Sequence, residues 1–345
     1  MRTLRTILLT LLSLAIAAPL VRAQDVHFSQ YNAAPLMLNP AFAGLNGCDY
    51  RVGANFRTQW LNVSGGNTYR TTSVFGDVAI GKATRYSNFA GLGVSFVSDQ
   101  AGDLNLGTNK VDLSAAYHVL IDGDRVQSIS MGIYGGVGVR SIDQTQAVYG
   151  DQLDPVSGFD PGEGGEVLIE PTRVYADAGA GFIYSYGSRP SKERPFSFHL
   201  GLSLAHVNQP NLSFFDDASE RLYLRFVGHG GSEIPVSDRL ALMPGFAFMK
   251  QGPSNQFLLS HWFKYRLNPL PGRSNSISFG TMYRLRDALV LGVRGDFAGV
   301  RIGFSYDINL SQLTSSTNTV GGPEFSLSYT GCFTKKNKER YCPAY

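Results

Sequence analysis

Hydrophobic and polar residues alternate with a period of two over most of the chain. In the stretch 300–310, the even positions from Val300 to Leu310 are apolar, and the odd positions are small or polar. Side chains at i, i+2 and i+4 lie on one face of a strand, so each such stretch predicts a two-faced β-strand. We expect about fourteen strands of this kind, near residues 50–56, 67–81, 87–99, 107–121, 128–140, 173–187, 196–205, 220–228, 238–250, 255–267, 275–285, 286–296, 300–310 and 323–333.

An even number of roughly ten-residue alternating strands is typical of an outer-membrane barrel, whose apolar face meets lipid. A soluble β-sandwich would show the same alternation with its apolar face inside. Three features favour the membrane: small residues on the polar face, aromatic residues near strand ends, and a last strand that alternates and ends on Phe333. We therefore predict an all-β fold, a transmembrane antiparallel β-barrel of about fourteen strands with an N-terminal periplasmic or plug segment.

The chain begins with the pattern of a secretory signal peptide. Arg2 and Arg5 precede the apolar run 7–20, and small residues at Val21 and Ala23 fit a cleavage site. After residue 23 no apolar run is long enough for a transmembrane helix. We expect a signal peptide at 1–23, an N-terminal plug or periplasmic docking segment at 24–48, a barrel at 49–333 and a periplasmic tail at 334–345, all in a protein of the cell outer membrane.

The sidedness of the barrel follows if both of its ends are periplasmic. The connections after odd-numbered strands, including 98–109, 141–172, 207–220 and 311–322, would then face the cell exterior. Most of the other connections are shorter, which agrees with the long outer loops and short periplasmic turns of such barrels.

The composition of the chain argues for a folded protein and against a nucleic-acid partner. The chain of 345 residues has 12% aromatic and 17% charged residues and a net charge of +3. The aromatic content excludes a disordered chain, and the weak, evenly spread charge argues against nucleic acid. Membrane lipid is the expected surrounding of the apolar face.

Chemistry-bearing residues are sparse. None of the six histidines has metal-ligand spacing, and no nucleophile elbow or phosphate loop occurs. We predict no catalytic, cofactor-binding or metal site and no cofactor, and we expect His206 and His261 on the outward face. Charges of both signs on the lumen face indicate ion-paired networks. Bulky lumen residues favour a plugged barrel, namely Phe75, Tyr134, Tyr175, Tyr223 and Trp262.

Distinctive motifs lie near the two ends of the chain. A Gln-Asp-x-x-Phe-Ser-Gln-Tyr stretch, an Asn-Pro-Ala-aromatic-Ala-Gly motif and an aromatic-Arg-x-Gln-Trp strand end follow the apolar leader. Their residues include Phe28, Ser29, Gln30, Tyr31, Asn39, Pro40, Phe42, Gly44, Arg57, Gln59 and Trp60. Near the C-terminus, 304–310 reads Phe-Ser-Tyr-Asp-Ile-Asn-Leu and 321–327 reads Gly-Gly-Pro-Glu-Phe-Ser-Leu. Together these motifs resemble those of the PorP/SprF family of type IX secretion and gliding-motility proteins, and Val26 and Pro323 depart from the residues common in that family.

The resemblance implies a noncatalytic barrel that supports export or surface attachment of secreted proteins such as adhesins. It also implies contacts with other type IX components. Some family members contact a periplasmic OmpA-like, peptidoglycan-binding protein, and others are each paired with one large secreted adhesin. The residues by themselves leave open a second class, an outer-membrane diffusion or uptake channel for small solutes.

The N-terminal segment is too apolar to lie free in water, because it carries Phe28, Tyr31, Leu36, Leu38 and Phe42. We expect it to pack in the periplasmic mouth or to dock a periplasmic partner, with a structural plug as the alternative.

The cell envelope is oxidising, so the three cysteines are free to pair. Cys48 precedes the first strand and lies near the end of the last strand in a closed barrel. Cys48 has outward parity and Cys332 has lumen parity, so their direct pairing requires a twist before the first strand. We favour a Cys48–Cys342 disulfide, followed by Cys332–Cys342, with no disulfide as a third possibility.

Overall fold

The protein is described by a computed structural model that covers residues 25–59, 69–82, 88–102, 104–121, 126–143, 152–154, 158–159, 171–187, 196–214, 220–267, 275–311 and 319–333. The short helices of the described residues are η1 (Tyr31–Ala33), α2 (Pro35–Leu38) and η2 (Pro40–Phe42). The strands are β1 (Tyr50–Gln59), β2 (Tyr69–Ile80), β3 (Phe89–Ala101), β4 (Leu106–Leu120), β5 (Val126–Ser141), β6 (Leu153–Asp154), β7 (Gly158–Phe159), β8 (Thr172–Gly187), β9 (Ser197–Ala205), β10 (Arg225–Pro235), β11 (Leu240–Gln251), β12 (Ser254–Arg266), β13 (Ser276–Arg284), β14 (Ala288–Phe297), β15 (Val300–Asn309) and β16 (Val320–Gly331).

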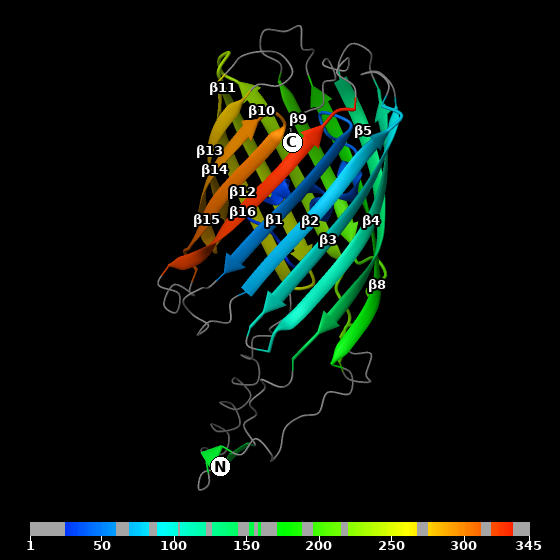
Figure 1. The fold of residues 1–345 in the computed structure, drawn as a ribbon, viewed down its shortest axis with the longest axis vertical. Coiled ribbons are helices and arrows are strands. Elements are labelled where there is room, and N and C mark those ends of the chain that lie inside the picture. Colours follow the sequence, from blue (N-terminus) through cyan, green and yellow to red (C-terminus); the bar gives the residue numbers. More distant parts are fainter. Residues whose placement is uncertain are drawn as a thin grey trace, which may run out of the picture.

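Fourteen of these strands form one closed antiparallel barrel, in which each strand pairs with its neighbours in the chain and β1 closes on β16 (Figure 1). Only β6 and β7 stand apart, as a two-stranded hairpin between β5 and β8. The predicted barrel and strand number are therefore confirmed. The largest shift of a strand start is at β10, which begins at Arg225 and not near residue 220. Tyr223 therefore precedes the strand and is 41% exposed instead of lining the lumen.

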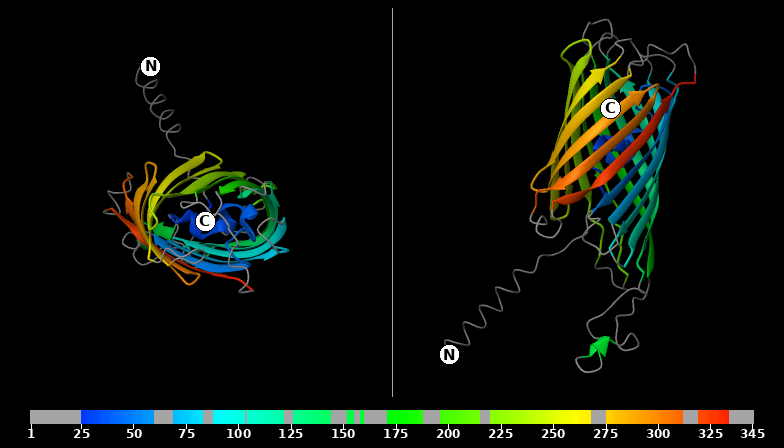
Figure 2. Two further views of the ribbon diagram at one scale, coloured as in Figure 1. Left: turned by 90° about the horizontal axis from the view of Figure 1, so that it is seen from above. Right: turned by 60° about the vertical axis from the view of Figure 1, so that its left-hand side comes forward.

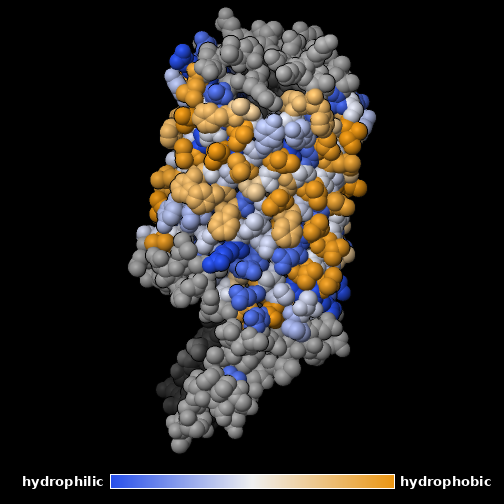
Figure 3. Space-filling model, viewed as in Figure 1, coloured by the Kyte–Doolittle hydropathy of each residue, from blue (hydrophilic) through white to orange (hydrophobic). Residues whose placement is uncertain are grey.

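The predicted alternation sets the inner and outer faces of the wall. Along β1, Arg51, Asn55 and Arg57 are buried inside the barrel, whereas Val52 and Phe56 are 50% and 40% exposed on its outer face. On the face seen in Figure 3, apolar side chains form a broad band across the outer wall. Such a band matches the lipid-facing surface of outer-membrane barrels. Among the described residues, no helix has both the length and the apolar character needed to cross a membrane.

The two rims of the barrel differ. β1 ends at the rim that carries the connections 142–171 and 206–224, which we call the long-loop rim. β1 begins and β16 ends at the opposite rim, which carries the short turns 236–239 and 298–299 (Figure 1). We call this second one the disulfide rim, for the reason given below.

Residues 25–48 lie within the lumen and are called the plug here. The plug's three short helices occupy the centre of the ring when the barrel is viewed end-on (Figure 2). The hydrophobic core of the protein is the contact between plug and inner wall. Its plug residues are Tyr31, Leu36, Leu38, Ala41, Phe42, Ala43 and Leu45, and its wall residues include Phe75, Phe89, Ile183, Val227, Trp262 and Met282.

Candidate functional site: the lumen plug

Four sequence motifs that lie far apart in the chain meet in one buried cluster. The Glu324 carboxylate accepts hydrogen bonds from the backbone N–H groups of Ser29 and Gln30, both at 2.8 Å. The Asp307 carboxylate accepts from the Ser29 hydroxyl at 2.9 Å and from Arg57 Nη2 at 2.7 Å. Ser29 and Gln30 belong to the plug, and the other three residues belong to β1, β15 and β16. The cluster therefore fixes the first part of the plug to β1 and β16, whose pairing closes the barrel and is called the seam here, and to β15 next to them.

Arg284 at the end of β13 completes this cluster and balances its charge. Its Nη2 donates to Asp307 at 3.0 Å, and its Nη1 donates to the Ser29 hydroxyl at 3.1 Å. Arg57 also donates to the His27 carbonyl at 2.6 Å. The charged side chains of this set, two guanidinium groups and two carboxylates, are each at most 3% exposed. Buried charges are tolerated at such low exposure when they are paired and hydrogen-bonded, as here. We call the following six residues the latch: Ser29, Gln30, Arg57, Arg284, Asp307 and Glu324.

The Asn-Pro motif anchors the middle of the plug. The Asn39 side-chain oxygen accepts from the Ala41 N–H at 2.9 Å and so caps η2, in which Pro40 occupies the first turn. The Asn39 Nδ2 group donates to the carbonyl oxygens of Phe182 in β8 and Leu202 in β9, both at 3.1 Å. This one fully buried amide therefore both starts a helix in the plug and binds the wall.

Two glycines let the wall approach the plug closely. A Cβ atom at Gly132 in β5 would lie 2.5 Å from the Ala41 nitrogen, and one at Gly181 in β8 would lie 1.9 Å from the Asn39 side-chain oxygen. Neither distance leaves room for a side chain, so the lumen at this level is shaped to the plug. The small residues that the sequence places on the polar face have this packing role here.

The last part of the plug is bound to Asp77 of β2. Its carboxylate accepts from the Gly44 N–H at 2.9 Å, from Asn46 Nδ2 at 3.1 Å and from Arg51 Nε at 2.9 Å. Gly44 has φ +71°, and an added Cβ there would lie 2.7 Å from a backbone atom of the wall. Glycine is the residue that adopts such a φ without strain, which explains the end of the motif.

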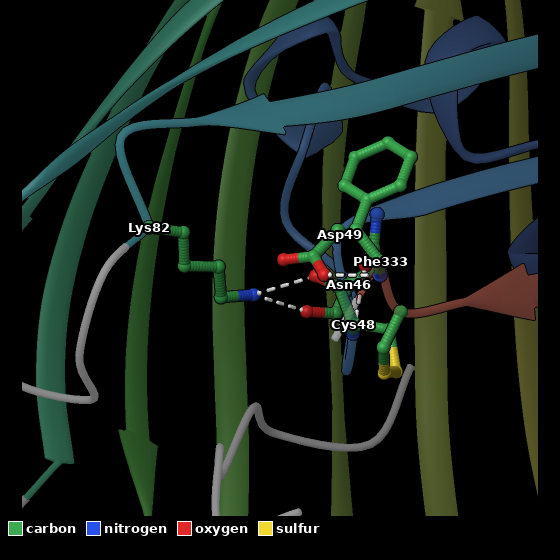
Figure 4. Close-up of a disulfide and its surroundings, with 6 residues drawn as sticks. Asn46, Cys48, Asp49, Lys82 and Phe333 are labelled. Carbon is green, nitrogen blue, oxygen red and sulfur yellow. Dashed lines mark hydrogen bonds between the residues drawn. A yellow bond between two sulfur atoms is a disulfide. The ribbon is translucent and has the colours of Figure 1, made fainter. Parts of the chain in front are cut away.

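The structure joins Cys48 to Cys332, with their Cα atoms 4.9 Å apart, at the disulfide rim (Figure 4). The predicted Cys48–Cys342 pairing was therefore wrong, and Cys342 lies outside the described residues. The parity argument failed because residues 46–49 form bends and leave the strand geometry before β1 begins. Lys82 Nζ secures these bends by donating to the carbonyls of Asn46 at 2.6 Å and Cys48 at 3.2 Å (Figure 4).

The first described residue of the plug is held at the long-loop rim. The Asp25 carboxylate pairs with His206, which follows β9, and lies 3.6 Å from Arg225 Nη1 at the start of β10. His206 also donates from Nδ1 to Asp177 at 2.9 Å. Burial disfavours the charged imidazole, but the Asp25 and Asp177 carboxylates outweigh that effect and raise the pKa of His206 to about 9.

The predicted outward position of His206 was wrong, because its side chain is only 3% exposed and lies inside the barrel. The backbone at His206 has φ +58°, which turns the chain out of the strand and breaks the alternation. His261 does share the outward face of β12 with Leu259 and Phe263.

The aromatic residues of the first two motifs lie within the plug. Phe28 and Phe42 are buried, and the Tyr31 hydroxyl is 2.9 Å from the Ser260 hydroxyl of β12. Gln59 is the last residue of β1, and Trp60 lies outside the described residues. Sequence reasoning did not identify Arg284, Asp77 and Lys82 as plug contacts, although the lumen parity of Arg284 and Asp77 was a usable signal.

The plug leaves little open space around it. A cavity of about 80 Å³ lies between α2 and the wall and is lined by Leu36, Leu38, Lys110, Tyr134 and Arg225 among others. A second cavity near Arg51 and Arg294 has about 20 Å³. These volumes accommodate a few water molecules. No group of three or more potential metal ligands occurs among the described residues.

A family model described as "Type IX secretion system membrane protein PorP/SprF" matches residues 20–329. A comparison with curated protein sequences finds no match. Similar solved structures include the Ralstonia pickettii toluene transporter TbuX, with 12% identity, TM-score 0.43 and coverage of 90% of this chain and 96% of that one. The CymD monoaromatic hydrocarbon channel has 13% identity, TM-score 0.46 and coverage of 90% and 95%. A Pseudomonas aeruginosa FadL homologue has 11% identity, TM-score 0.44 and coverage of 86% and 93%.

Proposed function

Because the chain belongs to the PorP/SprF family of type IX secretion system membrane proteins, we propose that it is a noncatalytic, plugged barrel that supports export or surface attachment of secreted proteins such as adhesins. The protein is located in the outer membrane, and its family membership implies interaction with other components of the secretion system. In the proposed function the barrel acts through protein contacts and not by conducting a substrate through its lumen.

The single observation that supports this proposal most is the plug. Its first part is fixed by the latch, its middle by Asn39, and its last part by Asp77. Opening a continuous lumen would expose the paired charges of the latch and the apolar core around Leu36, Leu38 and Phe42. Such a change has a large cost, because breaking one buried ion pair alone costs about 3–5 kcal/mol. A permanently seated plug suits an anchoring or docking role better than solute flux.

We further propose two protein partners, one on each side of the outer membrane. The first is a periplasmic OmpA-like, peptidoglycan-binding protein, which would reach the barrel from the periplasm. The second is a secreted adhesin, which would meet the barrel at the cell surface. Both partners follow from the family resemblance, and a cross-linking experiment on whole cells tests each of them.

The function itself is tested with a deletion strain complemented by the full chain. We expect the deletion to remove secreted adhesins from the cell surface while uptake of small solutes stays unchanged. The purified full-length protein, inserted in planar bilayers, should show no steady conductance. Steady conductance together with normal surface adhesins in the deletion strain would overturn the proposal and favour a solute channel.

A further inference from the structure

The two ends of the plug lie at opposite rims of the barrel. At the start of the plug, the Asp25 N–H donates to the side chain of Gln251, the last residue of β11, at 2.8 Å. The Asp25 carboxylate binds His206, the first residue of the 206–224 connection, and Arg225, which directly follows that connection. All three partners are at the long-loop rim.

The other end of the plug is at the disulfide rim. Cys48 is bonded to Cys332, directly after the end of β16. Lys82, which follows the end of β2, donates to the Asn46 and Cys48 carbonyls. Between these ends the contacts progress in order through the latch, Asn39 and Asp77, so the plug crosses the lumen from one rim to the other.

The lengths of the connections indicate which rim faces the cell exterior. The two longest connections, 142–171 and 206–224, are both at the long-loop rim, although that rim also has the short turns 252–253 and 285–287. The disulfide rim carries the start of β1, the end of β16 and the two-residue turn 298–299. Outer-membrane barrels have long extracellular connections and short periplasmic turns, so the long-loop rim is the extracellular one.

We propose that the plug enters the barrel from the extracellular mouth, so that the mature N-terminus created by signal-peptide cleavage is displayed at the cell surface. The chain then passes through the lumen towards the periplasm before it turns into β1. Proteins that contact the start of the plug must reach it from outside the cell, and periplasmic partners meet the disulfide rim instead. The orientation of the plug does not depend on which protein the barrel helps to export.

The experiment uses full-length protein in whole cells, with one octapeptide epitope per variant. The test variant carries the epitope between Gln24 and Asp25. Two matched controls carry it between Gly252 and Pro253, at the long-loop rim, and between Ala298 and Gly299, at the disulfide rim. Each variant is first shown to be a folded barrel by its change of gel mobility on boiling, and cleavage of the signal peptide is checked by mass spectrometry.

We expect antibody to label the 24–25 and 252–253 epitopes on intact cells, and the 298–299 epitope only after the outer membrane is permeabilised. A 24–25 epitope that is unlabelled on intact cells overturns the proposal, whether or not permeabilisation exposes it. Labelling of the 298–299 epitope on intact cells also overturns it, because the barrel would then have the opposite sidedness.

Discussion

Replacement of Asp307 by asparagine should release the plug while the barrel stays folded. Asp307 is at the centre of the latch, where it accepts hydrogen bonds from Arg57, Arg284 and the Ser29 hydroxyl. The substitution keeps the size of the side chain but removes its charge. Two guanidinium groups then remain with Glu324 as the one fully buried carboxylate, because Asp287, which also pairs with Arg284, is 41% exposed. The buried part of the cluster is left with a net positive charge.

The magnitude follows from the burial of the latch. The Asp307 and Arg57 side chains are 3% and 2% exposed, so water cannot replace the lost carboxylate charge. Removing one partner of a buried ion pair costs about 3–5 kcal/mol. The backbone hydrogen bonds between the strands do not involve this side chain, so the wall of the barrel stays intact. The unbalanced charge is relieved at the lowest free-energy cost when Ser29 and Gln30 leave the cluster. Since 1.4 kcal/mol is a factor of ten, the population with a released plug should rise by about two to three and a half orders of magnitude.

The assay is limited proteolysis of the folded protein in detergent. Cleavage within 26–44 tracks the population of released plug when opening and closing are fast compared with cleavage. We expect Asp307→Asn to be cut there at least about a hundredfold faster than the wild type, while both proteins keep the same gel mobility before boiling. In planar bilayers the variant should also show openings that the wild type lacks.

The matched control is Asp296→Asn on the neighbouring strand β14. Asp296 also pairs with an arginine, Arg301, at 2.6 Å, but both side chains are partly exposed, at 22% and 32%. A partly exposed pair is worth at most about 1 kcal/mol, so this variant should resemble the wild type. Equal cleavage rates in the Asp307 and Asp296 variants would refute the assignment of the latch as the anchor of the plug.

Gly132→Val should exclude the plug, because a Cβ there would lie 2.5 Å from a plug backbone nitrogen; Gly135→Val, with open space around it, should keep the wild-type resistance to protease. Cys332→Ser should lower the temperature at which the gel mobility changes, since the disulfide spans 284 residues and contributes about 5 kcal/mol in the loop-entropy model; an unchanged temperature would contradict this. The raised pKa of His206 means that its pair with Asp25 is complete below pH 6.5 and is lost as the pH rises through about 9. Cleavage near the start of the plug should therefore increase around pH 9 in the wild type and show no such step in His206→Gln.

The wall of the barrel could be predicted from sequence because its pattern is local. Successive residues of β1 and of β15 face the lipid and the lumen in turn, and this period of two is visible in the sequence itself. The two errors of parity have local causes as well. The bends at 46–49 and the positive φ at His206 interrupt the strand geometry, so counting by two no longer gives the direction of the side chain.

The latch could not be predicted in the same way. Its members were recognisable as motif residues or as lumen-facing charges, but their partners depend on the stagger of the closed barrel, which alternation does not encode. Arg284 illustrates this point, because its lumen parity was clear while its pairing with Asp307 across β13 and β15 was not. The path of the plug was equally open, since a segment of about two dozen residues reaches up to about 80 Å when extended and can end at either mouth.

The two strands of the seam, β1 and β16, are held together at both ends by contacts besides their backbone hydrogen bonds. These contacts oppose a lateral opening of the barrel wall between the two strands. At the disulfide rim, Cys48 and Cys332 bond the two strands covalently. Towards the long-loop rim, Arg57 of β1 lies beside Glu324 of β16, and both hold the plug through the latch. A lateral opening at the seam would have to break the disulfide, the strand ladder and a buried ion-pair network together. A polypeptide that crossed the wall at another strand pair would still meet the seated plug. Movement of the plug alone requires none of the ladder to break, so the latch is the part of the molecule whose loss changes the lumen at least cost.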